Sequence, residues 1–271
     1  MSFDDYWDAV DDELARLPAR PVLEPVPSRT TEDYTSYDVW LTSAGPYRIF
    51  GNLSVPTGPG PFPALLETPR YGSVNQVSHH NEKLRYVVFA VTHRGQRNAD
   101  TPFAAAYPGL FTHGIESPES YVYRGIVADC LRGAEFLLAR PDTDRAGVVG
   151  DDLALITAAR RTGFTALRVA EPLFYRVSDR PPEELADHLR AHPSAQVWET
   201  LSYFDPVRHA PGVGATTLLA TDDGSWYEPL ADALPDAEIY PLTHEDAADN
   251  DGLDAWLAGR LGVEPMSRFV R

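Results

Sequence analysis

The sequence contains little lysine and little cysteine, and each shortage excludes a class of site. Lys83 is the only lysine among 23 basic residues, whereas aspartate and glutamate together number 40, so the formal net charge is −17. A field of this sign does not attract phosphate backbones or acidic lipids, which argues against nucleic acid and membrane surfaces as partners. Cys130 is the only cysteine, so neither a disulfide nor a thiolate metal site can form within one chain.

Long apolar runs, repeats and low-complexity linkers are also missing. No stretch approaches the roughly 18 apolar residues of a membrane span, and the first residues form no basic and apolar leader. No glycine-rich phosphate loop follows a strand pattern and no metal-ligand spacing occurs, so we expect no cofactor. With 271 residues, 43% of them hydrophobic, the sequence predicts a single cytoplasmic domain over residues 1–271.

The order of the apolar patterns indicates the fold class. Residues 1–33 predict an N-terminal helix, with Ser2 as its cap, and an extension. The alternating residues 34–41 and 47–55 predict an antiparallel hairpin at a sheet edge. Further along, short apolar runs alternate with helical patterns; they lie at residues 63–68, 86–91, 146–150, 166–170, 216–220 and 237–242. This alternation predicts an α/β fold with a mostly parallel sheet covered by helices on both faces.

In such a sheet, ligand sites lie beyond the carboxyl ends of the strands. The polar or aromatic residues that follow the apolar runs are therefore the candidates for chemistry; they are Tyr71, Arg94, Gln96, Asp151, Asp152, Asp222, Asp223 and His244. The chain order of the last five is an acidic turn, then an acid, then a histidine. The α/β-hydrolases use the same order of elbow, acid and histidine.

The acidic turn falls where an α/β-hydrolase holds its nucleophile, on a strand-turn-helix elbow written G-x-S-x-G. Here the elbow reads Gly150-Asp151-Asp152-Leu153-Ala154, so Asp152 stands where a serine is expected. A serine-type mechanism is thus not available at this turn.

Several fragments carry a family resemblance. They are Phe62-Pro63-Ala64-Leu65-Leu66 followed by Tyr71-Gly72, Arg94-Gly95-Gln96, Gly114-Ile115, Tyr121-Val122-Tyr123-Arg124 with Asp129, Tyr203-Phe204-Asp205, and His244-Glu245. With these fragments the chain resembles the α/β-hydrolases of the acetyl xylan esterase and cephalosporin-C deacetylase family, from about residue 47 to residue 260.

The resemblance implies an α/β-hydrolase fold and a set of site residues. It implies Asp152 at the nucleophile position, His244 as base and Asp222 or Asp223 as the acid that orients it. It also implies an oxyanion hole from the backbone N–H groups of Tyr71 and Leu153. Members of the family often form ring-like oligomers, so a homo-oligomer is an option here too.

Two segments depart from the family pattern. The family elbow reads Gly-x-Ser-Gln-Gly-Gly, whereas Leu153-Ala154-Leu155 follows Asp152 here. Arg70-Tyr71-Gly72-Ser73 stands where the family has His-Gly-Tyr-Gly-Gly.

An aspartate at this turn has three physical options. Its carboxylate can attack carbon and form an ester that activated water hydrolyses. It can act as a base toward substrate or water. It can simply cap the following helix, since aspartate is a favoured N-cap. Our leading hypothesis is a hydrolase of a small ester or related electrophile. The alternatives are a catalytically silent ligand-binding homologue, and a lyase, isomerase or cyclase with Asp152 as acid or base.

The other residues have supporting roles in this interpretation. We expect Arg94 and Gln96 to contact substrate or brace the loops around the site, and Asp151 and Trp226 to belong to the same surroundings. A guanidinium can tie a carboxylate in place, so Arg124 and Asp129 predict a structural pair. Residues 172–205 lie where hydrolases insert segments that cover the substrate.

Overall fold

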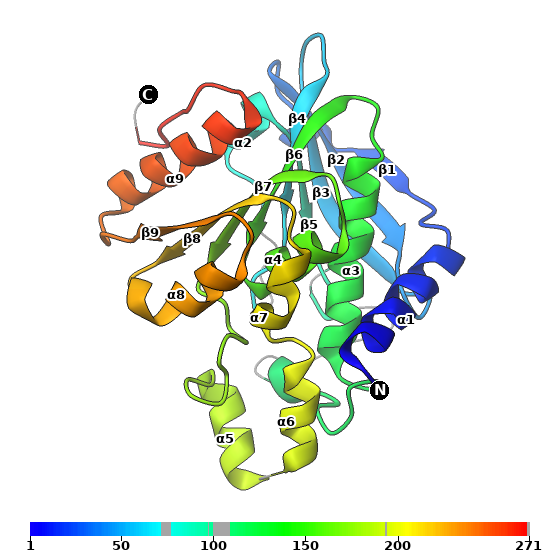
Figure 1. The fold of residues 1–271 in the computed structure, drawn as a ribbon. Helices are drawn as coiled ribbons and strands as arrows, with labels where there is room; N and C mark the ends of the chain where they lie inside the picture. The colour runs from blue at the N-terminus through cyan, green and yellow to red at the C-terminus, as the bar shows by residue number, and fades with distance from the viewer. Residues whose placement is uncertain (72–76, 97, 100–108, 193, 270–271) are drawn as a thin grey trace.

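The computed structural model describes residues 1–71, 77–96, 98–99, 109–192 and 194–269, and a nine-stranded sheet forms its centre (Figure 1). The strand order is β1-β2-β3-β5-β4-β6-β7-β8-β9. The strands are β1 Val22–Pro25, β2 Tyr34–Thr42, β3 Arg48–Pro56, β4 Phe62–Glu67, β5 Val87–Val91, β6 Thr143–Gly150, β7 Phe164–Ala170, β8 Thr216–Thr221 and β9 Ala237–Pro241.

The sheet is parallel over most of its width. Neighbouring strands from β5 through β4, β6, β7 and β8 to β9 pair in parallel. The pairs β1-β2, β2-β3 and β3-β5 are antiparallel. The α/β prediction and the antiparallel hairpin are confirmed. The hairpin of β2 and β3 carries β1 on its outer side, a strand that the sequence pattern did not indicate. All four residues of β1 are exposed, so the alternation that predicts a half-buried strand is missing there.

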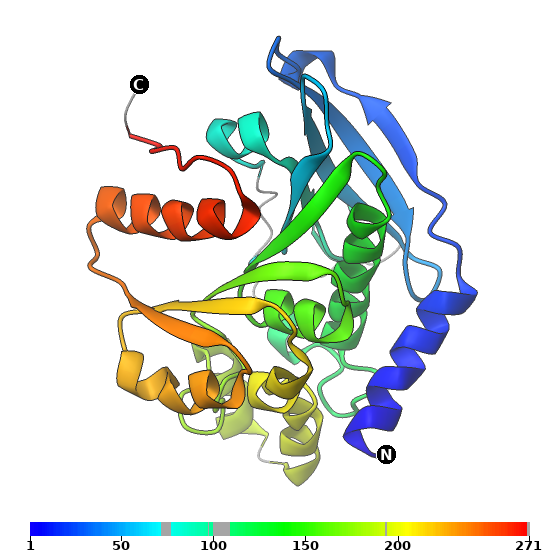
Figure 2. The same ribbon diagram turned by 45° about the horizontal axis from the view of Figure 1, so that its top comes forward.

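Helices cover both faces of the sheet (Figure 2). They are α1 Phe3–Arg16, α2 His80–Arg85, α3 Val122–Leu138, α4 Asp152–Arg160, α5 Glu183–Ala191, α6 Ala195–Ser202, α7 Pro206–His209, α8 Gly224–Ala233 and α9 Asp246–Leu261. One face packs against α3, α4 and α8 in the larger apolar cluster, and the other packs against α9 in the smaller one. Among the described residues, no helix is long and apolar enough to cross a membrane.

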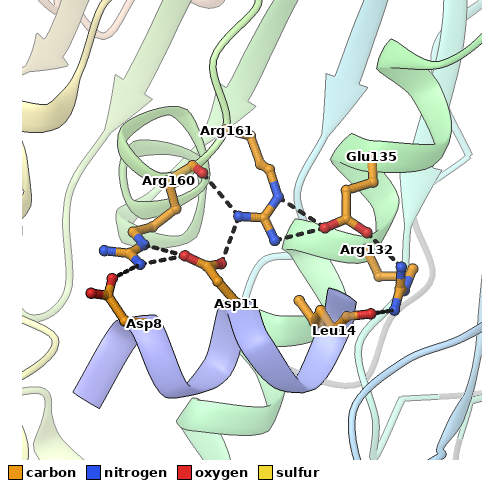
Figure 3. A network of polar contacts seen from close by, with 7 residues as sticks. All are labelled: Asp8, Asp11, Leu14, Arg132, Glu135, Arg160 and Arg161. Atoms are coloured by element: carbon orange, nitrogen blue, oxygen red, sulfur yellow. Dashed lines mark hydrogen bonds and ion pairs between the residues drawn. The ribbon is translucent and has the colours of Figure 1, made fainter. Parts of the chain in front are cut away.

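The helix α1 packs against the rest of the domain through buried apolar side chains and forms ion pairs with α4 and the residue that follows it. Ser2 caps it by accepting a 3.1 Å hydrogen bond from the Asp5 N–H, as the sequence predicts. Tyr6 and Trp7 are at most 1% exposed, so α1 is an integral part of the core. Figure 3 shows the ionic contacts: acids of α1 pair with Arg160 and Arg161 at the end of α4, and Arg161 also pairs with Glu135 of α3.

The helices α5 and α6 extend beyond the carboxyl edge of the sheet, away from its layers (Figure 1). They lie within residues 172–205, which the sequence marks as a covering segment. Tyr71, which follows β4, donates a hydrogen bond from its hydroxyl to Glu184 of α5. The projecting pair is therefore tied back to the edge where the candidate residues lie.

Candidate functional site

The step from β6 to α4 has the geometry of a capped helix. Gly150 ends the strand, and a Cβ there would lie 1.9 Å from Thr68 Oγ1, so a side chain has no space. Asp151 is the N-cap residue, with φ −107° and ψ −139°, and its carboxylate accepts a 3.0 Å hydrogen bond from the Leu153 N–H. Asp152 is already the first helical residue. A strained turn that projects a side chain outward is not formed here.

The carboxylate of Asp152 lies inside the protein, with 1% of the residue exposed. Its Oδ1 accepts a 3.0 Å hydrogen bond from the Phe174 N–H, and its Oδ2 accepts one from the Leu173 N–H. Both oxygens are thus bonded to the backbone that follows β7. The side chain ties the start of α4 to that segment.

The two adjacent acids have raised pKa values. Burial raises the pKa of Asp151 to about 6, and the Leu153 N–H opposes the rise. Burial, and next the charge of Asp151, raise the pKa of Asp152 well above its ordinary value, while the Leu173 and Phe174 N–H groups oppose the rise. Two like charges on neighbouring buried residues therefore oppose each other's ionisation.

Aromatic rings fill the space beside the segment that Asp152 holds. Phe174 is 1% exposed, and its ring centroid lies 4.7 Å from that of Tyr123 and 5.8 Å from that of Phe111. Phe111 in turn stacks on Tyr71, with centroids 3.8 Å apart. Phe204 closes the cluster at 5.9 Å from Phe174. A substrate at this position would have to displace packed rings.

The structure gives the contacts of the Leu153 backbone N–H, and for Tyr71 those of the side chain. The Leu153 N–H is used by the Asp151 carboxylate. Tyr71 contributes its ring and hydroxyl to the contacts with Phe111 and Glu184. Gly72, the next residue of the family fragment, lies outside the described residues.

His244 and Asp222 come together at the ends of β9 and β8. His244 Nε2 lies 3.6 Å from Asp222 Oδ2, and the two side chains are 71% and 54% exposed. His244 has a φ of +63°, which is uncommon for a residue with a side chain. Asp249 holds this conformation, because its carboxylate accepts hydrogen bonds from the N–H groups of Thr243 and His244 and from the Thr243 hydroxyl.

Asp223 faces another way. Its carboxylate caps α8 by accepting a 3.2 Å hydrogen bond from the Trp226 N–H and pairs with Arg180 Nη1 at 2.9 Å. The hydrogen bond from Arg180 holds the pKa of this exposed carboxyl below its usual value. Of the two acids, Asp222 is therefore the neighbour of His244.

The ring of Trp226 packs against two arginine side chains. The guanidinium carbons of Arg176 and Arg180 are 4.3 Å and 3.9 Å from the centroid of its ring. The Trp226 carbonyl accepts a 3.0 Å hydrogen bond from the Tyr175 hydroxyl. The segment after β7 is thus held at α8 as well as at Asp152.

Arg94 and Gln96 bond to backbone and to a buried acid. The guanidinium of Arg94 forms a two-point pair with Asp129 and donates to the Ala44 carbonyl. Gln96 accepts from the His93 N–H and donates to the Arg70 carbonyl. These contacts join the loop after β5 to the neighbouring loops and to α3.

The expected pair of Arg124 and Asp129 is wrong. Asp129 pairs with Arg94, whereas Arg124 pairs with Glu13 of α1 at 3.2 Å. The two residues are five positions apart, but on a helix side chains three or four positions apart are neighbours. Helical spacing could have corrected this expectation in advance.

A sequence model of the acetyl xylan esterase (AXE1) family matches residues 1–223. The chain belongs to this family. One curated relative, the acetyl esterase Axe7A of Xylanibacter ruminicola, is 23% identical over 195 residues. That match covers 64% of the chain and 43% of Axe7A, so the chain spans less than half the length of this relative.

Solved acetyl xylan esterases have the same fold as this AXE1-family chain. The enzyme from Paenibacillus sp. R4 superposes with a TM-score of 0.78 at 23% identity, over 97% of this chain and 94% of that one. Acetyl xylan esterase 1 from Thermoanaerobacterium sp. JW/SL YS485 gives 0.77 at 20% identity, over 96% and 92%. The α/β-hydrolase fold of the family is thus present along the chain.

Within this family fold, the residues predicted for catalysis do not all lie together. Asp222 and His244 lie together at the exposed ends of β8 and β9. Asp152 is buried, and within the described residues no hydrogen bond or ion pair joins it to either of them.

Two parts of this arrangement were missed at the sequence level. Asp249, which holds His244, could have been found as an acid in the first turn of the helix after the histidine. The Leu173 and Phe174 N–H groups had no signal, because backbone donors leave no side-chain pattern.

Proposed function

We propose that this chain is a non-acylating member of the acetyl xylan esterase family, a ligand-binding homologue whose turn at Asp152 anchors the fold instead of attacking substrate. The observation that carries the proposal is the pair of backbone N–H groups, from Leu173 and Phe174, on the two oxygens of Asp152. An anchored carboxylate supports neither acyl transfer nor ester formation.

The three options for Asp152 differ in what they require. A nucleophile or a base needs an ionised oxygen that reaches substrate, and burial both removes that access and raises the pKa of Asp152. An anchor needs only donors that remain bonded, and Leu173 and Phe174 supply them. The contacts therefore favour the anchor.

A second candidate function comes from His244. Its ring lies beside Asp222, and Asp249 fixes its backbone, so it has the surroundings of a general base with an orienting acid. Such a pair can deprotonate a water that attacks the carbonyl carbon of a small activated ester and expels its alcohol or phenolate, with no covalent enzyme intermediate. This candidate function is hydrolysis in which Asp152, at the turn after β6, takes no part.

The segment after β7 supports a covering role for residues 172–205. Asp152 holds its start, and Trp226 packs against Arg176 and Arg180 within it. In this proposal the segment closes the face over the turn and leaves the His244 side open to solvent.

The test is hydrolysis of para-nitrophenyl acetate by the wild type, Asp152→Asn and His244→Gln, each checked for folding by thermal unfolding. We expect no burst of nitrophenolate in any protein, since no acyl-enzyme forms. If the second candidate holds, the steady rate falls in His244→Gln and persists in folded Asp152→Asn. A burst equal to the enzyme concentration that Asp152→Asn abolishes would refute the proposal.

A further inference from the structure

A cavity of about 230 Å³ lies at the carboxyl end of β5, against the N-terminal end of α3. Its walls come from α1, the turn between β2 and β3, the loop after β5 and the start of α3; the lining includes Glu13, Gly45, Arg94, Glu119, Arg124 and Gly125. Neither Asp152 nor His244 lines it, so it is separate from the turn at Asp152 and from the pair of His244 and Asp222.

Arg94 presents one unused amino group in this cavity. Its Nε and Nη2 bond to Asp129, and Nη2 also bonds to the Ala44 carbonyl. Within the described part of the chain Nη1 has no hydrogen-bond partner, and the Arg94 side chain is 15% exposed. A Cβ on Gly125 would lie 2.6 Å from this Nη1, so glycine at that lining position leaves space for it.

Arg124 supplies a second guanidinium. Its Nη1 bonds to Glu13 at 3.2 Å, and no hydrogen bond occupies its Nε or Nη2 among the residues that the structure describes. The other oxygen of Glu13 accepts the Gly45 N–H at 2.9 Å, so that carboxylate already has partners on both oxygens. Arg124 therefore keeps N–H donors without a partner among the described residues, while both oxygens of Glu13 are already hydrogen-bonded.

The start of α3 adds positive potential. Its N-cap, Tyr121, makes no side-chain cap bond, and its first turn holds no acidic residue. The helix has 17 residues, so its N-terminal dipole is developed. Glu119 on the lining and the net charge of −17 oppose an anion, so the local donors must supply the attraction.

We propose that this cavity binds a compact oxyanion, the carboxylate or phosphate group of a small molecule, between the guanidinium groups of Arg94 and Arg124. Guanidinium groups donate in a planar fork that suits both kinds of oxyanion. Such an anion site is independent of the role of Asp152.

The test is calorimetric titration of the full chain with sodium malonate and with inorganic phosphate, using glycerol as a neutral probe. Arg124→Gln should weaken binding by about tenfold or more, since a charge-assisted bond is lost. Arg140→Gln is the matched control, because Arg140 also pairs with an acid and lies, like Arg124, 5.8 Å from an aromatic ring, but lines no part of the cavity. It should leave affinity unchanged.

A third variant tests the sign of the charge. Glu119→Gln removes a lining carboxylate and should tighten binding of both anions. Binding of malonate alone would identify carboxylates, and binding of phosphate alone would identify phosphates. The proposal is overturned if neither anion binds the wild type at millimolar concentration, if glycerol binds equally, or if folded Arg124→Gln binds as well as Arg140→Gln.

Discussion

At the scale of single residues, the pair Asp151 and Asp152 decides what the turn after β6 can do. One carboxylate caps α4 and the other bonds to two backbone N–H groups of a distant segment. Burial favours the neutral form of each acid, while the hydrogen bonds and the N-terminal end of the helix favour the charged form. The net result is a raised pKa for both.

The raised pKa of Asp151 predicts a pH effect on stability. The pKa of Asp151 is about 6 in the folded protein and 3.8 when unperturbed. At pH values between these two, the folded protein therefore binds more protons than the unfolded chain. Stability contributed by this group therefore falls as pH rises from about 4 to 6 and stays lower above. Asp151→Asn keeps the cap and cannot ionise, so we expect it to gain about 1–3 kcal/mol at pH 8 and nothing near pH 3.

Urea unfolding at both pH values measures this gain. Asp223→Asn is the matched control, because Asp223 also caps a helix but has a lowered pKa through Arg180. Replacing it should bring no gain at pH 8. Equal stability of Asp151→Asn and wild type at pH 8 would contradict the account of the buried acids.

Removing the Asp152 carboxylate should be costly. Asp152→Ala leaves the buried N–H groups of Leu173 and Phe174 without acceptors, for an expected loss of about 2–4 kcal/mol in unfolding free energy. Asp205→Ala, which removes a cap with a single N–H partner, should cost about half as much. Urea unfolding of the two variants compares them, and a loss below 0.5 kcal/mol, roughly the size of a surface change, would rule out the anchor.

At the scale of elements, α1 is held by an ionic network at the ends of α3 and α4 (Figure 3). Asp11 is central, since it contacts both Arg160 and Arg161, and its side chain is 30% exposed. Asp8 contacts Arg160 alone and is 69% exposed. Ion pairs contribute more when they are shielded from water and share partners in a network.

We expect Asp11→Ala to lower the unfolding free energy by about 1–2 kcal/mol and Asp8→Ala by less than about 0.5 kcal/mol. The same two variants, measured in high salt, should differ less, because exposed ion pairs are screened. Identical losses for the two variants would show that the network is not organised around Asp11.

The elements themselves were largely predictable. Continuous apolar runs predicted the buried strands, and Ser2 predicted the start of α1 because a capping hydroxyl is a local signal. The helix α2 was not found, because its six residues, His80–Arg85, are nearly all polar and show no apolar stripe. When a short helix is stabilised by packing against neighbouring elements, its own sequence gives little indication that a helix forms there.

At the scale of the whole molecule, similarity to known proteins shows the fold, whereas the positions of the site side chains come from the structure of this chain. The fold matches solved acetyl xylan esterases over nearly the whole chain. Strand order brings Asp222 and His244 together, and the sequence could place both, since they follow apolar runs. The orientation of Asp152 could not be predicted, because it depends on where residues 171–174 pass after β7.

The most direct measurement is single-turnover reaction in H₂¹⁸O with aryl acetates, epoxides and haloalkanes, followed by mass analysis of the peptide that contains Asp152. A carboxylate that attacks an epoxide or haloalkane carbon forms an ester, whose hydrolysis brings a solvent oxygen into the side chain. Attack on an aryl acetate forms a mixed anhydride and releases the phenolate, and this anhydride labels Asp152 when water attacks its aspartyl carbonyl carbon. We predict no label in Asp152, even for a substrate that turns over. Incorporation of ¹⁸O into that carboxylate would contradict the account and establish Asp152 as a nucleophile.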